Sequence, residues 1–199
     1  MEKIEARIQM NHDRAEANFL NYQYANNALG IFLNKTKQEP LRDKTVVAAS
    51  GDHNNWMLFQ YNDSRLNMQY GVPFYLYIPA QYEHNTVKKL NRYGSHKDIF
   101  STLIPITLSG ARYLNTGNNL LGNDSVAYFG INSKNVLISP KGAIKNITSI
   151  LPEYFEWQND LLVKHTSEPS DELVTLYKKG RAREFLLQYH FNEIVNTKP

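Results

Sequence analysis

The sequence predicts an α/β fold: a partial, parallel-type sheet with flanking helices, followed by a small antiparallel hairpin and C-terminal helices. Two short apolar runs, residues 45–50 and 72–79, are bounded by polar and turn-forming residues and indicate strands. Residues 13–38 and 95–110 have the apolar spacing of helices. The chain has 199 residues, 42% apolar and 21% charged, so it can build the core of one domain.

The first predicted helix, residues 13–38, ends before Pro40 and leads through a short loop into the strand over residues 45–50. Its apolar positions are Ala15, Phe19, Tyr22, Ala25, Ala28, Leu29, Phe32 and Leu33. The strand is a continuous apolar run, so we expect it to be buried on both faces, as in parallel sheets. A helix that leads into such a strand is half of a β-α-β unit.

Residues 53–71 are polar and aromatic with weak periodicity, which predicts a loop with one helical turn. The second strand, residues 72–79, has its prolines at the two ends, where a missing N–H does least harm. Residues 80–94 then form a surface connection.

The helix over residues 95–110 carries its own start and stop signals. Ser95 and Asp98 occupy the two positions of a capping box, and Gly110 is placed to end the helix. Pro105 lies inside it and is expected to kink it.

Beyond residue 111 the sequence becomes rich in turn-forming residues. Two short β-type runs predict an antiparallel hairpin that pairs residues 126–131 with 136–139. Residues 146–163 and 170–195 are predicted to be helical, with Gly180 weakening or breaking the middle of the last helix.

Composition excludes several classes of function. The formal net charge is +3 and no dense Lys/Arg run occurs, so nucleic acid is not an expected partner. The chain has no cysteine, which excludes disulfides and a Cys-ligated zinc site. No signal-peptide pattern and no apolar run near the roughly 20 residues of a membrane span are present in this chain.

Three residues follow the predicted strands and could form a site. Asp52 and His53 come directly after the first strand, and His96 begins the helix that follows the second. In open α/β sheets, ligands bind beyond the carboxyl ends of the strands. A carboxylate oxygen and an imidazole nitrogen suit Zn²⁺ or Mn²⁺, and a helix N-terminus favours anions. The pattern therefore indicates a metal-assisted site for phosphate or sulfate.

The segments "TVVAASGDHNN", "VPFYLYIP" and "SHKDIFSTLIPITLSGARYLNTGNNLL" resemble, in order and spacing, the C-terminal part of the sulfatase-like branch of the alkaline phosphatase superfamily. That branch includes lipoteichoic acid synthases, phosphoethanolamine transferases and arylsulfatases. The resemblance covers about residues 20–140 and implies an alkaline phosphatase-like sheet, with residues 141–199 as a helical C-terminal extension. The GDH turn and the SHxDI helix in this order are more specific together than either is alone.

The resemblance implies a role for each matching position. Asp52 and His53 match the metal-ligand pair, for which the divalent metal would be Zn, Mn, Mg or Ca. His96 matches a position that would contact the substrate or a second metal, and it is our candidate catalytic residue. Asn54 and Arg92 are candidates for substrate binding. Asp98 matches the Asp at the helix start, where it is a cap rather than a ligand.

The sequence departs from the family pattern at two positions. Asn54 replaces the Gly after GDH, a mild change because Asn tolerates unusual backbone angles. Ser101 replaces the Pro of "DIxPTL", which removes a helix-start preference and leaves the chemistry unchanged.

In that family the nucleophile and the other metal ligands come from strands N-terminal to the GDH motif, and residues 1–51 contain no such segment. We therefore expect residues 1–199 to be the C-terminal portion of a larger catalytic domain, inactive alone and partnered by the missing N-terminal portion. The parent protein would be extracytoplasmic, in the periplasm or on the outer face of the cytoplasmic membrane. Its substrate would be a phospholipid head group or a sulfate ester.

Plainer interpretations stay open. Asp52 and His53 could be a turn aspartate and a surface histidine, His96 an exposed residue near a cap, and Arg92 a solvated surface charge. The chain could equally be a non-catalytic, detached module that binds an anion or self-associates as a homo-oligomer, since an incomplete sheet exposes a strand edge and apolar surface.

Overall fold

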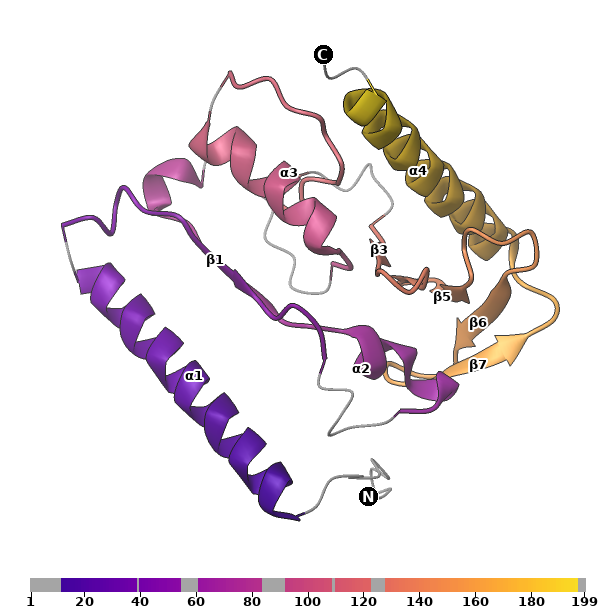
Figure 1. Cartoon of the computed structure of the whole chain (residues 1–199), viewed down its shortest axis with the longest axis horizontal. Coiled ribbons are helices and arrows are strands. Elements are labelled where there is room, and N and C mark those ends of the chain that lie inside the picture. Colours follow the sequence, from indigo (N-terminus) through magenta and orange to yellow (C-terminus); the bar gives the residue numbers. More distant parts are fainter. Residues whose placement is uncertain are drawn as a thin grey trace. The chain divides into compact units, whose positions relative to one another are not determined.

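The computed structural model describes residues 12–38, 40–54, 61–83, 92–108, 110–122 and 128–196 (Figure 1). Within them the fold is mixed α/β, with four helices, a two-strand antiparallel hairpin and a five-strand antiparallel sheet. The chain divides into two compact units: Met1–Asn62 with Met68–Asn85, and Asp63–Asn67 with Thr86–Pro199. None of the described helices is both long and apolar enough to span a membrane.

The first unit contains helix α1 (His12–Gln38), which confirms the predicted helix to within one residue. Few of its apolar side chains are covered. Ala15 and Leu33 are buried, whereas Phe19 is 48% exposed and Phe32 54% exposed. The apolar spacing therefore predicted the helix correctly, but in this structure that spacing does not correspond to a buried face.

Strands β1 (Val47–Ser50) and β2 (Phe74–Tyr77) are neighbours in one sheet, as predicted, but they run antiparallel. Val47 pairs with Tyr77 and Ser50 with Phe74. The prediction of a parallel-type strand buried on both faces was wrong. Half-buried and exposed residues alternate along β1, which is typical of antiparallel strands with one covered face. The small side chains in "VAAS" leave little apolar surface that must be buried on the second face.

Short helical turns lie among the described residues between the two strands and directly after β2. A 3₁₀ turn (Asp63–Arg65) continues into α2 (Leu66–Tyr70), which confirms a helical turn in the predicted loop. A second 3₁₀ turn (Ala80–Tyr82) follows β2. Residues 84–91 of the predicted surface connection (80–94) lie outside the described residues.

The second unit begins its regular structure with α3 (His96–Thr107). Ser95 and Asp98 form the predicted capping box, in which each side chain accepts from the other residue's backbone N–H. Pro105 lies within the helix, and Gly110 has a left-handed φ of 81° just beyond it. Glycine adopts this conformation without the steric cost that a Cβ would bring.

The predicted hairpin is confirmed within the described residues as β3 (Gly130–Ile131) paired with β4 (Leu137–Ser139). It is part of a larger antiparallel sheet with the strand order β3-β4-β5-β6-β7. The other strands are β5 (Gly142–Lys145), β6 (Glu153–Trp157) and β7 (Val163–Thr166).

The prediction of a helix over residues 146–163 was therefore wrong. Asn146 has a left-handed φ of 57°, which begins a turn instead of a helix. "EYFEW" in β6 is rich in aromatic residues, which favour strands. Asn159 then makes the next turn, with its Oδ1 accepting from the backbone N–H groups of Leu161 and Leu162 at 3.0 and 2.9 Å.

The predicted helix over residues 170–195 is confirmed as α4 (Asp171–Asn196), to within one residue at each end. Its first half packs on the sheet through Leu173 and Leu176, which join a buried cluster with Leu137 and Ile144. Gly180 does not break the helix. It is buried, and a Cβ there would lie 2.5 Å from Leu137 Cδ1, so the glycine permits close contact between helix and sheet.

Candidate functional site

The turn that follows β1 carries Asp52 and His53 at the end of the β1–β2 hairpin. Two hydrogen bonds to one carbonyl hold the start of this turn: the Gly51 N–H donates to Pro73 O at 3.4 Å and the Ser50 hydroxyl at 3.1 Å. Both predicted ligands are exposed, the Asp52 side chain by 89% and the His53 side chain by 65%. The hairpin therefore fixes the backbone of the turn while its ionisable groups face solvent.

The Asp52 and His53 side chains are arranged against each other. Asp52 Oδ1 accepts the backbone N–H of His53 at 2.9 Å, and Asp52 Oδ2 lies 3.5 Å from His53 Nε2. His53 Nδ1 lies 2.8 Å from the backbone carbonyl of Asn54. A neutral imidazole that donates its Nδ1–H to a carbonyl keeps its lone pair on Nε2. The nitrogen that faces Asp52 is therefore the one able to bind a cation.

Asn54 fixes the far side of this turn. Its side-chain amide donates to the backbone carbonyl of Met68, in the same unit, while its own carbonyl faces His53. Asn54 thus acts through the backbone on the orientation of His53. Contact with a substrate, the role predicted for it, stays a prediction.

The donor set fits part of a metal site. Metal–ligand bonds of about 2.0–2.2 Å in tetrahedral geometry place neighbouring donor atoms about 3.4 Å apart, close to the 3.5 Å between Asp52 Oδ2 and His53 Nε2. A backbone carbonyl on the other ring nitrogen is the usual way to orient a metal-binding histidine. Two ligands are fewer than a catalytic metal needs, and the described residues contain no group of three His, Cys, Asp or Glu that could hold a metal.

His96, the third predicted residue, is the first residue of α3 and is exposed. It belongs to the second unit, whereas Asp52 and His53 belong to the first. Their convergence on one cleft therefore stays a prediction.

Arg92 is tied into the second unit. Its guanidinium donates to the carbonyls of Leu120 and Gly122, the latter at 2.7 Å, and lies 4.3 Å from the ring centroid of Tyr128. These contacts hold the turn of residues 119–122, so Arg92 stabilises the fold. The substrate-binding role predicted for it stays a prediction.

Asp98 is the centre of a buried network that sequence reasoning recognised only as a cap. Its side chain is 1% exposed and accepts from Ser95 N at 2.6 Å, Ser95 Oγ at 2.9 Å and Asn118 N at 2.6 Å. Arg183 of α4 completes the set, with Nη2 3.0 Å from Asp98 Oδ1. The same guanidinium donates to Thr116 O. No local signal in the sequence marks Arg183 as this partner.

The second departure from the family pattern also has a structural use. Ser101 is buried, and its hydroxyl lies 2.7 Å from Asn115 Oδ1, which also accepts the Gly117 N–H at 3.2 Å. This side chain holds the loop of residues 115–120 against α3.

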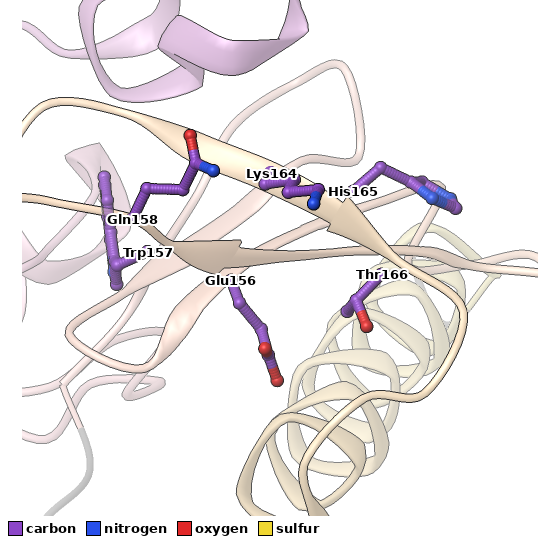
Figure 2. Close-up of a pocket in the computed structure, with 6 residues that line it drawn as sticks. All are labelled: Glu156, Trp157, Gln158, Lys164, His165 and Thr166. Atoms are coloured by element: carbon purple, nitrogen blue, oxygen red, sulfur yellow. The ribbon is translucent and has the colours of Figure 1, made fainter.

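A shallow cavity of about 240 Å³ lies on strands β6 and β7, and none of the predicted site residues lines it. It is lined by Glu156, Trp157, Gln158, Lys164, His165 and Thr166 (Figure 2). Figure 2 shows Glu156 and Thr166 pointing to one side of the strand pair and Gln158 to the other. The side chains that line this cavity therefore point to different sides of the strand pair. A binding site needs polar groups that converge on one point, and these do not.

Two tyrosines of the second unit have shifted acidity. Burial raises the pKa of Tyr93, and the negative charge of Asp160 adds to the rise. Burial likewise raises the pKa of Tyr154, with a further contribution from Tyr177. Tyr93 packs beside Trp157, with ring centroids 6.4 Å apart. These shifts report on packing around the sheet and do not identify a catalytic acid or base.

Comparisons with protein-family models, with curated proteins and with solved structures find no match to this chain.

Proposed function

We propose that this chain is part of a metal-dependent enzyme that transfers or hydrolyses phosphate or sulfate esters, and that Asp52 and His53 supply two of its metal ligands. The observation that carries the proposal is the geometry of the turn: donor atoms 3.5 Å apart, with the opposite imidazole nitrogen held 2.8 Å from a carbonyl. A simple ion pair between Asp52 and a protonated His53 would give the same 3.5 Å contact, and metal titration distinguishes the two.

Each residue of the turn has a distinct task. Asp52 brings a negative charge and, through its contact with the His53 N–H, fixes its own rotamer. Asn54 O holds His53 in the tautomer that leaves Nε2 free to bind a cation. A divalent cation bound there would lower the pKa of a nucleophile and neutralise charge on the transferring group.

His96 and the start of α3 are assigned to the substrate anion. An exposed imidazole at a helix N-terminus can bind a non-bridging oxygen or protonate a leaving oxygen. The helix dipole adds attraction for negative charge.

The β1–β2 hairpin also bears on the fold of the parent protein. A two-stranded hairpin is marginally stable alone, which supports β1 and β2 belonging to a larger, alkaline phosphatase-like sheet completed by other residues of the parent protein. Those residues would also contribute the Ser or Thr nucleophile and the remaining ligands. The parent would act outside the cytoplasm on a phospholipid-derived head group or, less favoured, a sulfate ester.

Metal titration of the purified 199-residue chain tests the ligand assignment. Zn²⁺ or Mn²⁺ is added to isotope-labelled protein, and the imidazole signals of His53 are followed by NMR. Binding is expected to be weak, since two ligands lack the multi-ligand geometry of a tight site. Asp52→Asn and His53→Gln should each weaken it about tenfold or more. His165→Gln, which alters another exposed histidine, is the matched control. Equal effects in all three variants would overturn the assignment.

An activity assay tests whether catalysis needs residues of the parent protein outside this chain. With Mn²⁺, Zn²⁺ or Mg²⁺, the chain should not turn over p-nitrophenyl phosphate, p-nitrophenyl sulfate or a glycerophospholipid. Turnover above that of an Asp52→Ala variant would mean that the chain carries its own nucleophile.

The alternative, a non-catalytic module that self-associates, is favoured by one observation: much of the apolar surface of α1 and α4 is exposed. Absence of any metal binding at the Asp52 turn would leave this alternative as the better account.

A further inference from the structure

The second half of α4 is unusually apolar for an exposed helix. Six large apolar side chains between residues 185 and 195 are more than half exposed: Phe185, Leu186, Tyr189, Phe191, Ile194 and Val195. The first half of α4 is different, because Leu173, Leu176 and Gly180 are buried against the sheet. Figure 1 shows α4 continuing for several turns beyond the strands. Exposed apolar surface of this extent marks an interaction site.

One row of this helix has a specific chemical order. Arg181, Phe185, Tyr189 and Glu193 are spaced four residues apart, so they form a single ridge along α4. The Arg181 guanidinium lies 5.4 Å from the ring centroid of Phe185. Along the helix the row therefore runs basic, aromatic, aromatic, acidic.

When a second copy of the row runs in the opposite direction, basic residues face acidic ones and aromatic residues face aromatic ones. In an antiparallel pair of α4 helices centred on residue 187, Phe185 of one copy meets Tyr189 of the other, and Arg181 meets Glu193. Both contacts then occur twice, as two-fold symmetry requires of a homodimer. A parallel pair would set Arg181 against Arg181 and Glu193 against Glu193, which like-charge repulsion disfavours. We propose that a second copy of this chain packs antiparallel on the ridge formed by Arg181, Phe185, Tyr189 and Glu193.

The surface available indicates a weak dimer. A fully covered aromatic side chain buries about 150–250 Å², and Phe185 and Tyr189 are 52% and 59% exposed. With Leu186 beside them, roughly 300 Å² of apolar surface per copy can be covered, about 600 Å² in all, below the about 1,200 Å² of standard stable interfaces. Ala182, on the same side of the helix, is small and exposed and lets the two backbones approach. The dimer is therefore expected to form at about 100 µM or above. This inference does not depend on the proposed metal chemistry.

Sedimentation velocity over a range of protein concentrations tests the proposal. The wild-type chain should shift from monomer to dimer, and the double variant Phe185→Ala/Tyr189→Ala should stay monomeric. Phe191→Ala is the matched control, because Phe191 is an aromatic residue with 62% exposure on the opposite side of α4. A wild-type chain that remains monomeric at about 1 mM, or association lost equally in Phe191→Ala, would overturn the proposal. Circular dichroism confirms that each variant keeps its helix.

Charge exchange tests the antiparallel order. Arg181→Glu and Glu193→Arg should each weaken self-association at least fivefold by placing like charges together. An equimolar mixture of the two should associate as wild type does, since each copy then restores the pairs of the other. Failure of the mixture to associate would refute the proposed contacts.

Cross-linking gives the direction independently, because the chain has no cysteine. An Ala182→Cys chain mixed with an Asn192→Cys chain should form a disulfide-linked dimer, since these positions are symmetric about residue 187. Faster linking of Ala182→Cys chains to one another would show a parallel pair and refute the antiparallel order.

Discussion

Replacing Arg183 with Met should destabilise the second unit by about 3 kcal/mol. The substitution keeps an apolar stem beside Phe129, whose ring centroid lies 5.5 Å from the Arg183 guanidinium. It leaves Asp98, with a side chain 1% exposed, without its cation. Removing one partner of a buried ion pair costs about 3–5 kcal/mol. Three other donors to the Asp98 carboxylate remain, which places the loss at the lower end.

The measurement is urea unfolding followed by tryptophan fluorescence. The chain has two tryptophans, so a Trp56→Phe background leaves Trp157 of β6 as the single reporter of the second unit. A loss of about 3 kcal/mol corresponds to a decrease in the urea midpoint of about 1–3 M, at an m-value of about 1–3 kcal/mol/M. Asp98→Asn should also destabilise. The double variant should lose less than the sum of the two by about 1–3 kcal/mol, because the groups interact directly.

An ion pair of similar length provides the control. Lys141 Nζ lies 2.9 Å from Oε2 of Glu172, a residue of α4 like Arg183. The Lys141 and Glu172 side chains are 52% and 63% exposed. Exposed pairs contribute about 0–1 kcal/mol, so Lys141→Met should change the free energy of unfolding by no more than that. If Arg183→Met cost no more than Lys141→Met, burial of Asp98 would not control the strength of this contact and the reasoning would be refuted.

Three further predictions follow from the same structure. Gly117→Ala should destabilise by about 1–3 kcal/mol in urea unfolding, because a Cβ there would overlap the backbone of Lys97; an unchanged midpoint would contradict this. Gly30→Ala should stabilise by about 0.5–1 kcal/mol, since an added Cβ meets nothing within 4 Å in α1; a loss of helicity by circular dichroism would contradict it. The pKa of Tyr93 is raised above its ordinary value of 10.0 by burial and by Asp160, so the stability it contributes is present below pH 10 and is lost as the pH rises through the raised pKa. Tyr93→Phe should remove part of this alkaline loss in an unfolding series from pH 9 upward, and identical profiles would exclude the effect.

The helices were predictable where the signals that make them are local. α1 follows from apolar spacing and a closing proline, and α3 follows from a capping box that the structure contains. These interactions join residues within one or two turns of each other. They act in the same way whatever the rest of the chain does.

The sheet was predictable only in part, because strand direction and pairing depend on distant partners. β1 and β2 were recognised as neighbours, but their antiparallel direction was not. β6 was mistaken for helix because short aromatic runs fit either period. The Asp98–Arg183 contact joins residues 85 positions apart, and Gly180 is explained by Leu137 on another element. Such contacts leave no mark on a single sequence.

The two motifs that carry the family resemblance differ in how the structure accounts for them. Asp98 of the SHKDI segment is completely used by folding: it caps α3, holds the 115–120 loop and pairs with Arg183. A residue with that many structural partners would be retained with or without catalysis, so its presence adds little to the case for an enzyme.

Asp52 and His53 are in the opposite position. They are exposed, and what they contact is mainly each other and the adjacent carbonyl. A carboxylate oxygen and an imidazole nitrogen 3.5 Å apart suit a bound cation, and an ion pair between Asp52 and a protonated His53 would give the same contact. The functional case therefore depends on the Asp52 turn, and metal titration of that turn is the experiment that decides it.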